Sequence, residues 1–198
     1  KDGKNAFYDP DSEDGLSDLA YACIAGQIDK HKSMSVICAP TVNAYKRLQP
    51  GQLSGYWANW GYDHRGVTIR VPHHRGKATR LENRMSDGAA NPYLATAAVL
   101  QAARLGYLHK TELPAAEDRD CFESQSTEIC TPANLHEACA ALAADQEFSN
   151  ALGAECVEGF LTVKEMEWEK YVEAVPNWEQ LDPTDVSQWE LDFYTPYL

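Results

Sequence analysis

The segment from Asn43 to Leu94 concentrates positive charge in a chain that is otherwise acidic. It contains six arginines, two lysines and three histidines. At its centre is the run Arg80-Leu81-Glu82-Asn83-Arg84, in which one carboxylate lies between two arginines. Because side chains alternate faces along a strand, we expect Arg80, Glu82 and Arg84 to point the same way. An exposed ladder of weak ion pairs is one interpretation of this pattern. The other is an anion site, because each guanidinium can bind two oxygens of a phosphate or carboxylate.

The charge balance restricts what such a site binds. The chain has 198 residues and a formal net charge of -13, which argues against a general nucleic-acid or anionic-membrane partner. Residues 43–84 are basic, whereas the chain from Glu112 onward is strongly acidic. This asymmetry favours a small anionic substrate, with nucleotide phosphate as the first candidate. Glu82 alone cannot hold Mg²⁺, but it can supply one oxygen ligand.

The cysteines and the apolar runs point to a reducing compartment. The six cysteines form no CxxC pair and no metal-binding spacing. We expect Cys23, Cys38, Cys139 and Cys156 to be small core residues, and a disulfide between Cys121 and Cys130 is a less favoured alternative. No apolar run approaches the length of a membrane span, and no signal peptide opens the chain. We therefore expect a cytoplasmic location, and we expect the polar opening residues to be the interior of a longer chain.

Periodicity predicts an α+β fold, with antiparallel strands packed against C-terminal helices. Residues 1–14 are expected to be a loop and residues 15–38 one amphipathic helix. Three strands with short connections are expected at 55–60, 65–71 and 79–85. A core helix should begin at Pro92, capped by Asp87 or Asn91. Further helices are expected from residue 132, at 145–148 and at 157–174, followed by an aromatic tail that docks on the core or on a neighbouring subunit.

Three separated motifs resemble the glutamine synthetase family, in its order and at its spacing. They are TVNAYKRLQPG at 41–51, WGYDHRGVTIRVP at 60–72 and RLENRMSDGAANPYLATAAVL at 80–100. The family's usual wording is close to NSYKRLVPG, NRSASIRIP and RIEVRFPDPSANPYLA. A weaker resemblance continues to the C-terminus. Taken together, the resemblance implies that residues 1–198 are the C-terminal part of that family's catalytic domain, without the upstream half and the N-terminal β-grasp domain.

The resemblance also implies roles for individual residues. Arg47 and Arg84 would hold the substrate glutamate. Arg65 and Arg84 would act on the transferred phosphoryl group. Glu82 would be a metal ligand. The residues along ATP would be Arg65, Arg70, Lys77 and Arg80.

The implied reaction joins the γ-carboxylate of glutamate to an amine, through a γ-glutamyl phosphate formed from ATP with Mg²⁺ or Mn²⁺. Members of the family form rings, so a large homo-oligomer is expected for the full-length protein. The 198 residues alone are expected to be inactive, because the family places most metal ligands upstream of them.

One departure from the family bears on the amine. The family's loop after YKRL carries a glutamate, in PGYEAP or PGFEAP, which helps to take a proton from ammonium. Leu53 stands at that position here, and a leucine neither attracts a cation nor accepts a proton. We therefore expect Leu53 to line a pocket for an organic amine. The alternatives are a glutamine synthetase that uses ammonium and a non-catalytic structural or regulatory relative.

Overall fold

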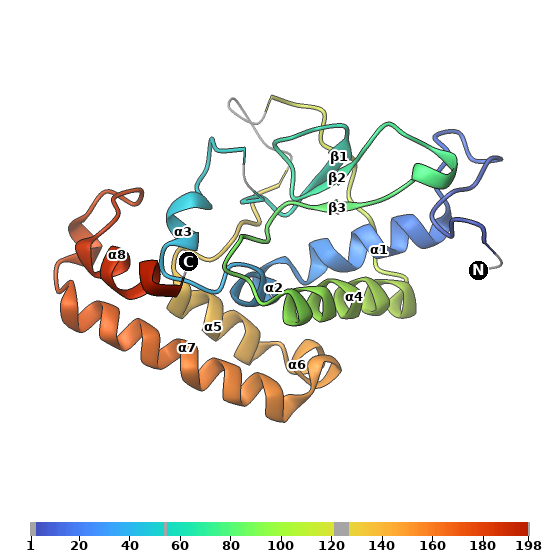
Figure 1. Cartoon of the computed structure of the whole chain (residues 1–198). Helices are drawn as coiled ribbons and strands as arrows, with labels where there is room; N and C mark the ends of the chain where they lie inside the picture. The colour runs from blue at the N-terminus through green and yellow to red at the C-terminus, as the bar shows by residue number, and fades with distance from the viewer. Residues whose placement is uncertain (1–2, 54, 121–126, 198) are drawn as a thin grey trace.

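The computed structural model describes residues 3–53, 55–120 and 127–197 of the chain. Helices lie beneath and beside a small sheet, so the α+β class is confirmed (Figure 1). The elements in chain order are α1 Asp18–Asp29, α2 His31–Cys38, α3 Ala44–Arg47, β1 Trp60–Tyr62, β2 Ile69–Val71, the 3₁₀ turn η1 Gly76–Ala78, β3 Glu82–Asn83, α4 Pro92–His109, α5 Leu135–Ala144, α6 Gln146–Leu152, α7 Ala154–Ala174, η2 Trp178–Gln180, α8 Gln188–Tyr194 and η3 Thr195–Tyr197.

Helices α1 and α4 form the platform beneath the sheet (Figure 1). Asn91 caps α4 by accepting hydrogen bonds from the backbone of Tyr93 and Leu94, so of the two candidate caps Asn91 is confirmed. The two helices touch through glycines. A Cβ on Gly26 would lie 2.1 Å from the carbonyl oxygen of Ala102, and one on Gly106 would lie 2.4 Å from that of Ala22. Any side chain at either position would therefore separate the helices.

The sheet has the order β1-β2-β3 and is mixed. Strands β2 and β3 are antiparallel, as expected, but β1 and β2 are parallel, so the prediction of an entirely antiparallel sheet is wrong in this respect. The strands are only two or three residues long. A connection of six residues reaches roughly 20 Å when extended, far enough to return the chain to the start of the next strand.

The strands expected at 65–71 and 79–85 are shorter than predicted, Ile69–Val71 and Glu82–Asn83, and two further boundaries differ for a reason that the structure shows. The strand expected at 55–60 begins only at Trp60, because the preceding segment instead forms an isolated bridge between Trp57 and Cys130 of the long loop. The helix expected over 15–38 is two helices that meet at Lys30. Lys30 leaves the helical conformation, and its ammonium lies 3.3 Å from the carboxylate of Asp145. In both cases the partner lies far along the chain, where local periodicity carries no information.

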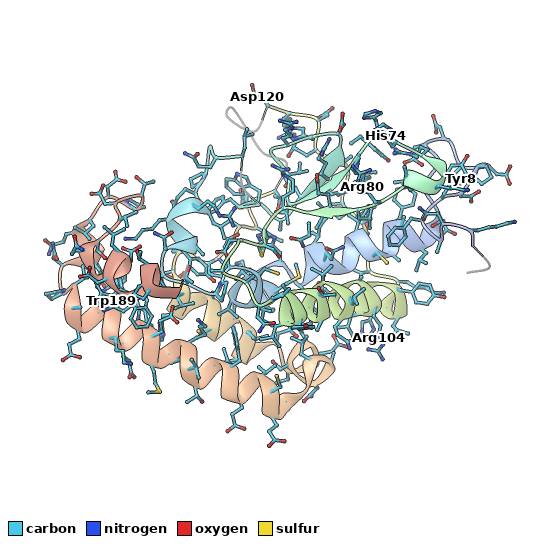
Figure 2. The ribbon with its side chains drawn as sticks, in the orientation of Figure 1. Tyr8, His74, Arg80, Arg104, Asp120 and Trp189 are labelled. Carbon is cyan, nitrogen blue, oxygen red and sulfur yellow. The ribbon has the colours of Figure 1, made fainter. Side chains whose placement is uncertain are left out.

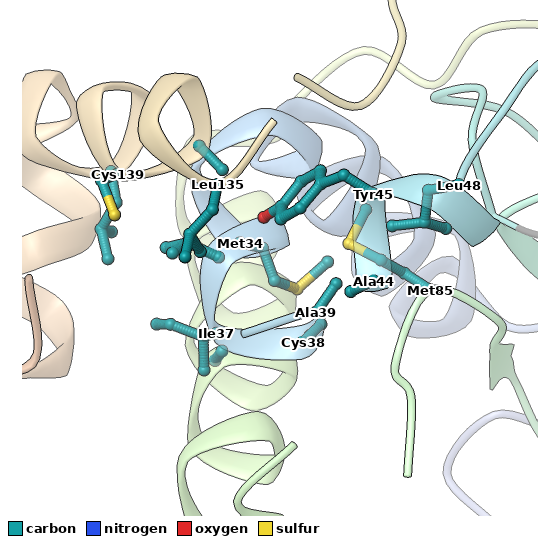
Figure 3. Close-up of a cluster of buried hydrophobic side chains, with 14 of the residues drawn as sticks. Met34, Ile37, Cys38, Ala39, Ala44, Tyr45, Leu48, Met85, Leu135 and Cys139 are labelled. Atoms are coloured by element: carbon teal, nitrogen blue, oxygen red, sulfur yellow. The ribbon is translucent and has the colours of Figure 1, made fainter. Parts of the chain in front are cut away.

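The main core lies between α2, α4 and the C-terminal helices (Figure 3). Tyr45 of α3 is buried in it beside Leu135 and Met34. A second, smaller core joins α1 to the sheet through Ile24 and Ile69, both fully buried. The site-bearing strands therefore rest on α1, while α3 is anchored in the larger core.

The aromatic tail docks on the core, which confirms one of its two expected positions. Glu190 of α8 is 2% exposed and accepts a hydrogen bond of 2.5 Å from Lys46 of α3. Burial raises the pKa of Glu190, but hydrogen bonds led by the one from Lys46 outweigh it, so the pKa lies below its ordinary value. Tyr194 adds a hydrogen bond of 2.6 Å to Glu167 of α7. The tail thus ties α3 to α7.

The cysteine predictions are confirmed in part. Cys23, Cys38 and Cys139 are buried, whereas Cys156 is exposed, because it lies on the solvent side of the first turn of α7. Cys121 lies outside the described residues, so its pairing with Cys130 stays a prediction. No helix in the described part of the chain is long and apolar enough to cross a membrane.

The glycine contact predicts a sharp contrast between two alanine substitutions. Gly106→Ala should destabilise the fold by about 3 kcal/mol, because its methyl group meets backbone atoms that cannot rotate away. Gly159→Ala in α7 should stabilise it by about 0.5 to 1 kcal/mol, because a Cβ there meets nothing within 4 Å and alanine favours helix. Urea denaturation of both variants measures the two effects. Equal midpoints would contradict the assigned contact.

A buried histidine predicts a loss of stability in acid. His31 is fully buried, and its Nε2 lies 3.1 Å from the carbonyl oxygen of Tyr56, to which it donates. Burial lowers the pKa of His31 from 6.5 to about 4. The unfolded chain therefore binds a proton that the folded chain excludes, so the stabilisation is complete above pH 6.5 and is lost as the pH falls towards 4.

Lowering the pH from 7.5 to about 4.5 should cost about 2 to 3 kcal/mol through His31 alone. His31→Gln provides the comparison, since an amide can donate to the same carbonyl and does not titrate. The change in unfolding free energy between the two pH values should be smaller in the variant by this amount. Parallel pH curves for the two proteins would show that His31 does not exclude the proton.

Candidate functional site

Arg70 and Glu82 are brought together by strand register. β2 and β3 place Arg70 directly opposite Glu82, and the Nη1 of Arg70 lies 2.9 Å from the carboxylate. Arg84, just beyond β3, approaches the same carboxylate at 3.8 Å. The carboxylate between two guanidiniums expected from the sequence therefore exists. One of its arginines, however, comes from the neighbouring strand.

Arg80, the arginine expected on the other side of Glu82, lies apart from this group. It is exposed and donates to the carbonyl oxygen of Ala78 at 3.3 Å, and none of the described ion pairs joins it to Glu82. The regular strand is confined to Glu82–Asn83, so the strict alternation of faces does not extend to Arg80. Lys77 is also exposed, in the turn η1 that precedes it. Figure 2 shows Arg80 on the sheet side of the molecule, towards the N-terminal loop.

Asp63 is a member of the group that sequence analysis missed. It follows β1 directly, and its carboxylate accepts a hydrogen bond from Arg70, on the guanidinium nitrogen that Glu82 does not use. This hydrogen bond lowers the pKa of Asp63 and raises that of Arg70. The run Tyr62-Asp63-His64 resembles an ordinary turn, and only the parallel pairing of β1 with β2 brings Asp63 to Arg70.

Arg84 connects two loops to the group. Its Nε donates to the carbonyl oxygen of Arg65 at 3.1 Å, and its Nη2 lies 3.5 Å from that of Leu53. The side chain of Arg65 is exposed, and that of Leu53 is 50% exposed. Arg84 thus places both loops beside Glu82 and leaves their side chains facing solvent.

Arg47 reaches the same region from α3. Its Nη2 donates to the carbonyl oxygen of Met85, the residue after Arg84, at 2.7 Å. The remaining positive charge of the segment is not part of this group. Lys46 binds the tail, and Arg75 donates to the carbonyl oxygen of Asp14 at 2.6 Å. We call Arg47, Asp63, Arg70, Glu82 and Arg84 the arginine cluster.

The arginine cluster can bind an anion and can contribute one metal ligand. Its guanidiniums present nitrogen donors on a partly exposed surface: the side chain of Arg70 is 18% exposed and that of Arg84 is 22% exposed. Among the described residues, no three histidines, cysteines or acids are grouped to hold a metal ion. Glu82 has the hard oxygen that Mg²⁺ or Mn²⁺ prefers, so it fits as one ligand of a site that needs others.

A cavity of about 260 Å³ lies elsewhere, between α3, α7 and the tail. Tyrosine and tryptophan side chains form part of its wall, and it contains none of the arginine cluster. Two of its polar side chains are already bonded, Lys46 to Glu190 and Gln49 to the carbonyl oxygen of Tyr45 at 2.6 Å. Its one cation is paired and its wall also carries Glu179 and Asp182, so it is poorly suited to an anion and the arginine cluster is the better candidate site.

Comparisons with known proteins agree on one family. The family model described as glutamine synthetase, catalytic domain, matches residues 1–182. A glutamine synthetase of Thermococcus kodakarensis is 38% identical over 201 residues, which cover 98% of this chain and 44% of that protein. A glutamine synthetase of Staphylococcus aureus is 36% identical over 200 residues, which cover 98% of this chain and 42% of that protein.

Two solved structures share the fold. Apo GmaS without ligand has a TM-score of 0.76 and 34% identity, covering 95% of this chain and 40% of that one. A GmaS/ADP complex has a TM-score of 0.77 and 34% identity, covering 97% of this chain and 43% of that one. The chain thus spans less than half the length of these relatives. The match over residues 1–182, together with the agreement in sequence and fold, shows that the chain belongs to the glutamine synthetase family.

Proposed function

We propose that the protein containing this chain is an ATP-dependent ligase that joins the γ-carboxylate of glutamate to an organic amine through a γ-glutamyl phosphate. The observation that carries this proposal is the arginine cluster, in which Arg70, Glu82 and Arg84 share one surface. A transferring phosphoryl group needs fixed positive charge around its oxygens. The family membership supports a ligase, and the solved GmaS/ADP complex supports a nucleotide as a ligand in a relative.

The roles within the cluster follow from its geometry and from the resemblance. Arg47 and Arg84 are assigned to the carboxylates of glutamate, and Arg65 and Arg70 to the phosphates. Lys77 and Arg80, exposed and outside the cluster, are assigned to a more distant part of the nucleotide. When bound, Mg²⁺ or Mn²⁺ would neutralise phosphate charge, and Glu82 would supply one of its ligands.

Leu53 is the reason to favour an organic amine. Its carbonyl oxygen lies beside Arg84, while its side chain is half exposed on the loop. An apolar side chain at this place can contact the carbon chain of a substituted amine, but it cannot accept a proton from ammonium. Glutamine synthesis from ammonium is the first alternative, because the curated relatives carry that name. A non-catalytic relative is the second, and the presence of the arginine cluster argues against it.

The rest of the expected assembly is also part of this proposal. A ring-forming homo-oligomer would supply the remaining parts of the site. The 198-residue chain alone is expected to show no turnover, because Glu82 provides only one metal ligand.

Removing Arg84 should weaken glutamate binding and loosen two loops at once. Arg84→Met in the full-length protein should raise the dissociation constant for glutamate about tenfold or more, as expected for a lost hydrogen bond to a charged group. Arg104→Met is the matched control, because Arg104 lies on the exposed face of α4, far from the sheet (Figure 2). Isothermal titration calorimetry measures both. Equal losses in the two variants would mean that only net charge matters.

The amine is identified by phosphate release with Mg-ATP and glutamate, in the presence of ammonium, methylamine, ethanolamine, putrescine, spermidine or aniline. We expect one organic amine to exceed ammonium in kcat/KM. Leu53→Glu should shift that ratio towards ammonium by about tenfold, because it adds a proton acceptor. Leu100→Glu, at an exposed leucine of α4, should leave the ratio unchanged. Robust glutamine formation by the wild type would favour the first alternative, and no release with any amine would favour the second.

A further inference from the structure

Asp63 has a backbone conformation that needs an explanation. Its φ is 47°, and among the described residues only Lys110 shares a positive φ without being glycine. Lys110 ends α4, where the left-handed conformation is common. Asp63 ends no helix. Aspartate tolerates this region better than most residues, but the conformation still costs free energy unless the surroundings impose it.

The bend at Asp63 directs its carboxylate to Arg70. The backbone amide of Asp63 donates to the carbonyl oxygen of Val71 at 2.8 Å, which fixes the residue against the end of β2. Its Oδ1 accepts from Nη2 of Arg70, while its Oδ2 lies 3.5 Å from Nδ1 of His73. Arg70 therefore has one carboxylate on each terminal nitrogen, Asp63 on Nη2 and Glu82 on Nη1.

This sharing changes what Glu82 can do. A guanidinium with a single carboxylate tends to bind both of its oxygens in a fork, which is the strongest arrangement for the pair. With Nη2 occupied by Asp63, Arg70 contacts only Oε2 of Glu82. The interaction between Glu82 and Arg70 is consequently weaker than it would be if Asp63 were absent.

The charges lead to the same result. Asp63 and Glu82 carry two negative charges, and Arg70 and Arg84 carry two positive charges, so the four side chains balance. Without Asp63 the other three would carry one net positive charge, to which Arg47 of the cluster adds another, and this disfavours a divalent cation and favours a phosphate. An exposed ion pair of no consequence is the alternative, since the Asp63 side chain is 47% exposed.

We propose that Asp63 is a positioning residue: it holds one side of Arg70 so that Glu82 stays available to a divalent cation. This inference rests on the proposed function, in which Glu82 supplies a metal ligand and Arg70 binds phosphate. It adds a residue that acts through Arg70 and touches neither the substrate nor the metal.

The test compares metal binding with nucleotide binding in the full-length protein. Asp63→Asn keeps the shape and the tolerance of the left-handed backbone while removing the charge. Glu173→Gln, on the exposed face of α7, removes the same charge far from the cluster. Mn²⁺ affinity is measured from the electron paramagnetic resonance signal of the free ion. ADP affinity without metal is measured by calorimetry, and the thermal midpoint reports the fold.

For Asp63→Asn we expect Mn²⁺ to bind about fivefold more weakly or worse, ADP without metal to bind equally well or more tightly, and the midpoint to be unchanged. Asp63→Glu should restore part of the Mn²⁺ affinity, and Glu173→Gln should change neither affinity. Unchanged Mn²⁺ binding in Asp63→Asn would overturn the inference. So would a parallel loss of both affinities with a lower midpoint, since that is the result of a merely structural role.

The same measurements separate this inference from the proposed function. If Asp63→Asn binds Mn²⁺ more weakly but the wild type releases no phosphate with any amine, the role of Asp63 stands and the proposed reaction is wrong. If the wild type releases phosphate but its Mn²⁺ affinity does not depend on Asp63, the proposed reaction stands and the role of Asp63 is wrong. A wild type that binds no Mn²⁺ would overturn the inference outright.

Discussion

The contact between α1 and α4 is the constraint on which the rest of the structure depends. Gly26 and Gly106 let the two backbones meet without side chains between them. The sheet rests on α1, while α6 packs against α4 and α5 against the neighbouring helix α2 (Figure 1). A wider separation would shift Ile24 of α1 relative to Ile69 of β2, and with it the strand that carries Arg70. A steric feature buried in the platform thus sets the position of the charged surface above it.

The balance between arginines and carboxylates allows that surface to bind a ligand. Two arginines at one carboxylate would neutralise it and leave a surplus of positive charge. Asp63 offsets the surplus from the far side of Arg70, while Arg84 directs part of its hydrogen bonding to the carbonyl oxygens of two loops. Each guanidinium is therefore fixed by groups that a small anion does not need to displace. A cluster prepared in this way can bind an anion with little reorganisation.

Local patterns predicted what depends on neighbouring residues, and they failed where the partner is distant. The cap at Asn91, one of two candidates, and a strand that ends at Val71 follow from the local sequence, and both are confirmed. The sequence placed Glu82 between Arg80 and Arg84 and did not pair it with Arg70, because register depends on tertiary structure. Asp63 was missed for the same reason. Its neighbours suggest a turn, and its function comes from a parallel pairing that hairpin rules do not anticipate.

The short helix α3 shows how distant parts of the chain determine the site. Four residues are too few to hold a helix by propensity, so α3 depends on its contacts. Lys46 is bound to Glu190 of the tail, and the next residue, Arg47, is bound to the carbonyl oxygen of Met85. Two adjacent cations therefore serve different purposes, one joining α3 to α8 and one facing the cluster. The position of Arg47 is consequently set in part by the pairing of its neighbour Lys46 with Glu190, which lies 144 residues later in the chain. A basic segment that looks local in the sequence is completed by the C-terminal tail.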